Sequence, residues 1–142
     1  MYRKILVALE NGRADETLLP HISQLARHFG SELLLVHVAD GWVARNYDLL
    51  RLAESEEMRR DREYLEETAA KLRAGGIPLV SVKLARGNPP TEIINTARDE
   101  HCDLIAMTTH GHRLLGDILF GSTIDEVRHK SMVPLLIVRA AS

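Results

Sequence analysis

Short runs of apolar residues alternate along this chain with longer stretches of mixed polarity. Continuous apolar runs are typical of strands that are covered on both faces of a sheet. Runs of this kind predict strands at Ile5–Leu9, Leu33–Val38, Leu104–Met107 and Leu135–Val138. An alternating run predicts another strand at Leu79–Leu84. The pattern therefore predicts a largely buried sheet whose strands are separated by other elements.

Between these runs, apolar residues recur every three or four positions, which is the spacing of one face of a helix. Gly30 is placed to end the first helix, and the prolines of Gly87–Pro90 can open the third. Residues Trp42–Arg51 show no clear pattern and are predicted to form a connection. The predicted helices cover Leu18–Phe29, Leu52–Arg73, Thr91–Glu100 and Ile124–His129.

The second predicted helix is rich in Glu, Arg, Ala and Leu and is followed by Gly75-Gly76. Several opposite charges on it are four residues apart, as in Glu56 and Arg60, which supports an exposed helix. We interpret its charged residues as a solvated face rather than as a docking surface.

Strands that alternate with helices over short connections require right-handed crossovers and give a parallel sheet between two helix layers. The chain shows no linker, no low-complexity tract and no internal repeat. We therefore predict one three-layer α/β/α domain, with a five-stranded parallel sheet, that spans residues 1–142.

The composition and charge of the chain exclude several classes of function. The 142 residues are 45% hydrophobic and 27% charged, as in an ordinary globular protein, and the formal net charge of −2 argues against binding to DNA or RNA. No apolar run approaches the ~20 residues of a membrane span. The opening residues Met1–Lys4 lead directly into a strand, so no signal peptide is expected. The single cysteine, Cys102, is expected to be a small buried residue, and a cytoplasmic location is favoured.

The candidate chemistry lies between the fourth strand and the last helix. Thr109-His110-Gly111 is followed by nine residues and then by Gly121-Ser122-Thr123. Glycines let the backbone approach a charged group closely, and the hydroxyls and N–H groups of Ser122 and Thr123 stand at a helix start, where phosphate is bound. The glycines can equally form turns while Ser122 caps the helix, and the spacing alone leaves both interpretations open.

In a parallel sheet of this kind, ligands bind beyond the carboxyl ends of the strands, where the strand order reverses. Three segments are expected to meet there, namely Ala8–Gly12, Val38–Gly41 and Thr108–Arg113. The glycine segment would then form one wall of a pocket that the first two strands complete.

One segment of the chain closely resembles the nucleotide-binding signature of the universal stress protein family. It consists of Thr108–Gly111, nine further residues and then Gly121-Ser122. That signature is glycine, two residues, glycine, nine residues, glycine, then serine or threonine. Further segments along the whole chain resemble the strands and loops of the family. These are Lys4–Leu9, Leu35–Val38, Gly87–Ile94 and Val133–Val138.

The resemblance implies an adenine nucleotide alpha hydrolase-like fold with strand order 3-2-1-4-5. It also implies that the ligand is ATP, with or without Mg²⁺, and that the chain forms a homodimer joined through Leu135–Val138. It implies that phosphates contact the glycine loop, that Val38 and Met107 pack near the base, and that Glu10 stands near the ribose and phosphates. Arg113 either neutralises phosphate charge or is an ordinary surface arginine. The full set of expected nucleotide-binding residues is Ala8, Leu9, Glu10, Val38, Met107, Thr108, His110, Gly111, Arg113, Gly121, Ser122 and Thr123.

Two positions depart from the family pattern. Thr108 replaces the first signature glycine, and a β-branched residue disfavours positive φ. Glu10-Asn11-Gly12 replaces a turn that resembles Asp-Gly-Ser, and glutamate reaches one methylene further. These departures favour the alternative function, a dimeric interaction module that has lost its nucleotide.

Other features argue against catalysis and metal binding. The loop contains no lysine to act on a β- or γ-phosphate, so a weak ATPase at most is expected, and no catalytic residue is assigned. His110 and His112 have no nearby Cys or Asp that completes a metal site. His37 lies within an apolar strand, where a core histidine with satisfied hydrogen bonds is expected.

Overall fold

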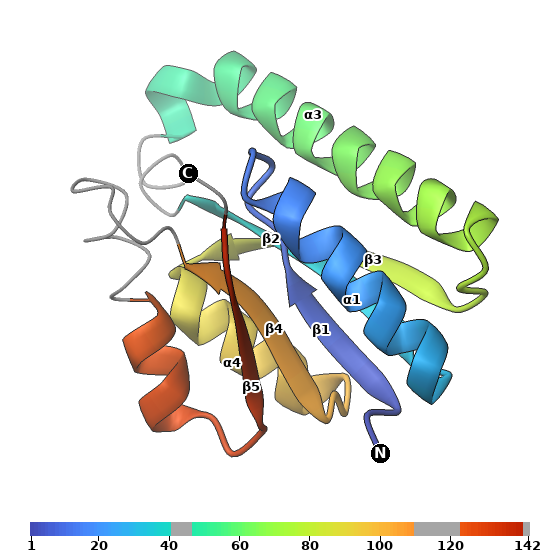
Figure 1. Ribbon diagram of the computed structural model, residues 1–142. Helices are drawn as coiled ribbons and strands as arrows, with labels where there is room; N and C mark the ends of the chain where they lie inside the picture. Colours follow the sequence, from blue (N-terminus) through green and yellow to red (C-terminus); the bar gives the residue numbers. More distant parts are fainter. Residues whose placement is uncertain (41–46, 110–122, 141–142) are drawn as a thin grey trace.

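The computed structural model describes residues 1–40, 47–109 and 123–140, with only the backbone described for residues 40 and 47–55. Five parallel strands form one sheet in the order β3-β2-β1-β4-β5, which confirms the predicted fold class (Figure 1). The strands are β1 Lys4–Ala8, β2 Glu32–Asp40, β3 Val80–Gly87, β4 Leu104–Thr109 and β5 Leu135–Arg139.

Helices cover both faces of this sheet. They are α1 Asp15–Phe29, α3 Tyr47–Ala74, α4 Pro89–Asp99 and a helix over residues 123–130. Figure 1 shows α1 and α3 side by side on one face, with α4 behind the sheet. None of the described helices is long and apolar enough to cross a membrane.

Alternate residues of the strands point into two separate cores, which explains the continuous apolar runs. On β1, Ile5 and Val7 pack against Leu18 of α1 and Leu65 of α3. Leu6, the residue between them, belongs to the other core. That second core includes Ile93, Ala97, Ile105, Ile124 and Val127, contributed by α4, β4 and the helix over 123–130.

Several predicted boundaries are correct. Gly30 ends α1 with a left-handed φ of 67°, and its N–H donates to the carbonyl of Ala26. Prolines stand at the start of α4, as predicted. In both cases the residue type fits the local backbone. Glycine tolerates a positive φ, and proline, which lacks a backbone N–H, is tolerated in the first turn of a helix because N–H groups there have no partner within the helix.

Other predicted boundaries are wrong, and the largest differences concern α3 and β3. Residues 47–51 belong to α3 and not to a connection. Leu49, Leu50 and Arg51 are good helix formers, so the helix extends there without a clear apolar period. β3 also continues beyond Leu84, because its last residues pair with β2 up to the register Asp40↔Gly87.

Candidate functional site

The carboxyl ends of β1, β2 and β4 meet at one edge of the sheet. β1 is flanked by β2 on one side and by β4 on the other, so the strand order reverses between β1 and β4. The register pairs Ala8 with Val36, and Val7 with Ala106. This edge is where ligands bind in open parallel sheets.

An apolar patch occupies one face of this edge. Ala8 and Val38 are partly buried and pack against the cluster that contains Met107, of which 6% is exposed. The structure thus brings together one residue from each of three strands that are far apart in the sequence. All three belong to the expected set of nucleotide-binding residues.

Leu9 and Thr108 point into the structure at this same edge. The Leu9 side chain belongs to the core under α1, and its N–H donates to the Val36 carbonyl over 2.8 Å. Thr108 is 4% exposed, and its hydroxyl has no hydrogen-bond partner in the described part of the chain. Because Thr108 lies within β4, where it pairs with Val138, a β-branched residue suits its backbone.

The turn that follows β1 is held by a buried carboxylate. The amides of Glu10 and Asn11 donate to the two oxygens of Asp15 over 3.0 and 2.9 Å. Asp15 is the first residue of α1 and only 1% exposed, and the Tyr64 hydroxyl donates to it over 2.6 Å. Burial, followed by this hydrogen bond, raises the pKa of Tyr64 far above its usual value, so the hydroxyl keeps its proton.

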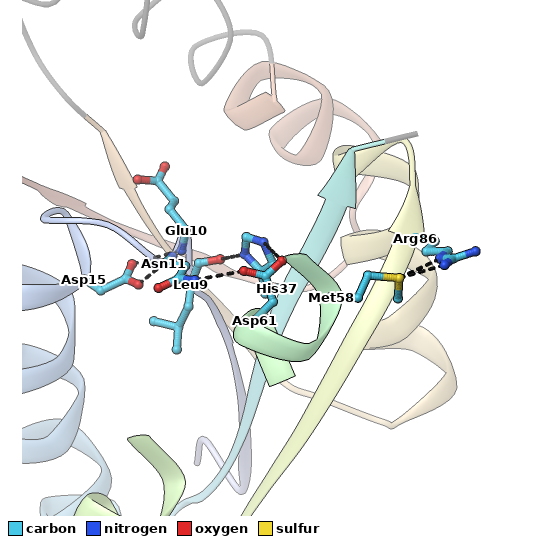
Figure 2. Close-up of polar contacts among 8 residues, drawn as sticks. All are labelled: Leu9, Glu10, Asn11, Asp15, His37, Met58, Asp61 and Arg86. Carbon is cyan, nitrogen blue, oxygen red and sulfur yellow. Dashed lines mark hydrogen bonds and ion pairs between the residues drawn. The ribbon is translucent and has the colours of Figure 1, made fainter. Parts of the chain in front are cut away.

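A second carboxylate holds the same turn from α3. Asn11 has a left-handed φ of 59°, and its Nδ2 donates to Oδ1 of Asp61 over 2.8 Å. The other oxygen of Asp61 lies 3.4 Å from Nε2 of His37, whose Nδ1 donates to the Leu9 carbonyl over 2.9 Å. Figure 2 shows these contacts around the turn. The network joins the ends of β1 and β2 to α3, and it gives Nδ1 of His37 a hydrogen-bond partner.

Sequence reasoning missed the carboxylates that build this turn. Asp61 was included in the solvated face of the charged helix, yet only 6% of it is exposed. Its signal was present in the sequence, because it precedes the buried Leu65 by four residues and therefore lies on the inward stripe. Asp15 carried a weaker signal, as an acidic residue in the first turn of a helix.

The expected phosphate-binding residues lie largely outside the described ranges. These are His110, Gly111, Arg113, Gly121 and Ser122, and His112 lies outside them as well. Thr123 is the first described residue of the last helix and is partly buried.

Two further expectations concern metals and the thiol. In residues 1–40, 47–109 and 123–140, no three His, Cys, Asp or Glu side chains gather in a way that could hold a metal ion. Cys102 is buried, as predicted, and burial raises the pKa of its thiol from 9.0 to about 11.

The sheet order and the three converging strand ends agree with the comparison of the chain with known families. The model of the Universal stress protein family matches residues 1–139. This chain belongs to the universal stress protein family.

Individual family members align over nearly the whole chain. A universal stress protein of Methanocaldococcus jannaschii is 28% identical, with 98% of this chain and 96% of that protein covered. The solved structure of the hypothetical protein MJ0577 has a TM-score of 0.84 at 28% identity, covering 100% of this chain and 99% of that one. A universal stress protein from Archaeoglobus fulgidus, solved in complex with dAMP, has a TM-score of 0.71 at 23% identity, covering 96% and 98%.

Proposed function

We propose that this chain binds an adenine nucleotide, ATP in the first place, at the carboxyl edge of β1, β2 and β4. The observation that carries the proposal is the apolar patch of Ala8, Val38 and Met107 beside a carboxylate-rich turn, at the point where the strand order reverses. A flat base fits an apolar patch, and a ribose offers hydroxyl donors to carboxylates.

Glu10 is the residue proposed for the ribose. Its amide is held by Asp15, and Figure 2 shows its carboxylate directed away from Asp15, Asp61 and His37. A carboxylate accepts hydrogen bonds only, which matches the hydroxyls of a ribose, and it can also contact a Mg²⁺ ion held by phosphates. Ala8 and Leu9 would contribute through their place at the end of β1.

The phosphates are proposed to bind the glycine loop that follows β4 in the sequence. Glu10, Asp15 and Asp61 place acidic groups around the turn after β1, so phosphates would approach this turn only through a cation such as Mg²⁺. The glycine loop offers backbone N–H groups and a helix start, so we assign the phosphates to Gly111, Gly121 and Ser122. The residues proposed to assist them are Thr108, His110, Arg113 and Thr123.

We further propose that the nucleotide acts as a regulatory ligand in a stress response, with little or slow hydrolysis. Residues 108–123 contain no lysine that could stabilise charge on the transferred phosphate. The dAMP complex of the Archaeoglobus fulgidus protein is a property of that protein, and it supports nucleotide binding here as a family trait.

The proposed assembly is a cytoplasmic homodimer joined through β5. This strand ends the sheet, and Ile137 on it is 40% exposed. An uncovered strand edge is a ready template for pairing, so a second copy of β5 would complete it.

Calorimetric titration with ATP, AMP and cyclic AMP, each with and without magnesium, tests nucleotide binding. We expect heat of binding for at least one of them and a rise in melting temperature that the Gly121→Val variant abolishes. The absence of both heat and thermal shift at millimolar nucleotide would overturn the proposal.

Thr108 and the turn Glu10-Asn11-Gly12 are the features that favour a different function. Because this buried threonine replaces the first signature glycine, the chain can be an interaction module without a ligand. The absence of any thermal shift by ATP in the wild type would support that alternative, whereas an equal shift in the wild type and in Gly121→Val would show that the loop is not the site.

A further inference from the structure

The structure points to a role for α3 that rests on the proposed nucleotide site. We propose that Asp61 of α3 is a positioning residue, which holds Asn11 of the β1 turn and His37 of β2 so that Glu10 leaves the turn in one fixed direction.

The first step is the backbone of the turn itself. Asn11 has a φ of 59°, a conformation that few non-glycine residues adopt. Asparagine tolerates this conformation better than most residues, and contacts from the surrounding structure help to hold it. Here the side chain of Asn11 is fixed by Asp61 over 2.8 Å, while its amide is fixed by Asp15 over 2.9 Å.

The second step is that Asp61 contacts one flank of Glu10 directly and the other through His37. On one flank it accepts the hydrogen bond from Asn11, the residue after Glu10. On the other flank it lies 3.4 Å from His37, which in turn bonds the carbonyl of Leu9, the residue before Glu10. Glu10 therefore stands between two residues that are both linked to one buried carboxylate, in addition to their backbone contacts.

The third step is that α3 itself is firmly placed. Leu65 and Ala69 are fully buried in the core under α1 and α3. One turn before Asp61, the Sδ of Met58 lies 2.7 and 3.2 Å from Nη2 and Nε of Arg86, at the end of β3 (Figure 2). A carboxylate on such a helix can orient the turn because its own backbone is held by packing.

The test compares Asp61→Ala with Glu66→Ala, which removes an exposed carboxylate from the same helix and changes the net charge equally. Two quantities are measured, namely the ATP dissociation constant by calorimetry and the backbone amide resonances of Glu10 and Asn11 without ligand. We expect Asp61→Ala to shift both resonances and to weaken ATP binding about tenfold, as loss of one hydrogen bond to a charged group does. Glu66→Ala should shift neither and change affinity less than twofold.

Two additional variants separate positioning from general loss of structure. Asp61→Asn keeps an acceptor for Asn11 and should restore most of the affinity, even if Asp61→Ala folds poorly. Asn11→Gly removes the same hydrogen bond as Asp61→Ala, and glycine relaxes the backbone. Because both changes remove one shared interaction, their losses of ATP affinity should not add in the double variant.

The outcomes distinguish this inference from the proposed function. If the wild type binds no adenine nucleotide, the proposed function fails, and the two resonances still decide whether Asp61 sets the turn. Unmoved resonances of Glu10 and Asn11 in Asp61→Ala would overturn the inference. If the wild type binds ATP, the inference would also be overturned by an Asp61→Ala variant whose resonances shift but whose ATP affinity equals that of the wild type.

Discussion

β1 is held at both ends by the same device, a carboxylate that accepts two consecutive backbone amides. At its amino end, Asp103 accepts from Arg3 and Lys4 over 2.9 and 3.1 Å. At its carboxyl end, Asp15 accepts from Glu10 and Asn11 over 3.0 and 2.9 Å. The two ends differ in burial and in the charges that surround the carboxylates.

At the amino end two acidic side chains share one basic neighbour, Lys4. Lys4 lies 3.4 Å from Glu100 and 3.9 Å from Glu32, and Asp103 itself is only partly buried. At the carboxyl end Asp15 is almost fully buried, and the donors from Tyr64 and Asn11 are neutral. A residue of positive φ lies near each end, Tyr2 at the amino end and Asn11 at the carboxyl end, so the two ends differ chiefly in how deeply their carboxylates are buried.

The largest effect is expected from Asp15→Ala. This change leaves two amides and the Tyr64 hydroxyl without their acceptor, in a buried place. We expect a loss of about 3 kcal/mol in the free energy of unfolding, measured by urea denaturation. Asp103→Ala, the matched variant at the amino end, should lose about 1 kcal/mol because water can reach its donors. Equal losses would mean that the two ends do not differ.

The next largest effect is expected on the free energy of unfolding at alkaline pH, and it arises at the amino end, where Cys102 precedes Asp103. Burial raises the pKa of the folded thiol from 9.0 to about 11, so the unfolded chain releases this proton first. The stabilising contribution is complete below pH 9 and is lost as the pH rises towards 11. We expect it to be on the order of 2 kcal/mol. Urea denaturation at several pH values should show a flatter decline for Cys102→Ala, and an equally steep decline would contradict this.

The smallest effect is expected from Thr108→Val at the carboxyl end. The Thr108 hydroxyl is buried without a partner among the described residues, so its replacement by a methyl group should cost nothing. We expect a gain of roughly 0.5–1 kcal/mol in stability, measured by thermal and urea unfolding. A loss of that size would show that the hydroxyl has a partner in a part of the chain that the structure does not describe.

Much of the fold could be predicted from the sequence, because apolar runs such as Ile5–Leu9 and the glycine at position 30 reflect local physical rules. The start of α3 at Tyr47 could not, since its first turns carry no clear apolar period. In the site, the resemblance to the family supplied Val38 and Met107, which the structure places in one cluster. Asp15, Asp61 and Tyr64 were missed because their role depends on contacts between elements that are far apart in the sequence.

The most direct test of nucleotide binding at this edge is a titration of ¹⁵N-labelled protein with ATP and magnesium, followed by its backbone amide resonances. We predict progressive shifts for residues 8–11, Val38 and Met107 at the carboxyl edge. The amides of Arg3, Lys4 and Asp103 at the amino end should not move. Shifts confined to the amino end, or none at millimolar ATP, would contradict the account.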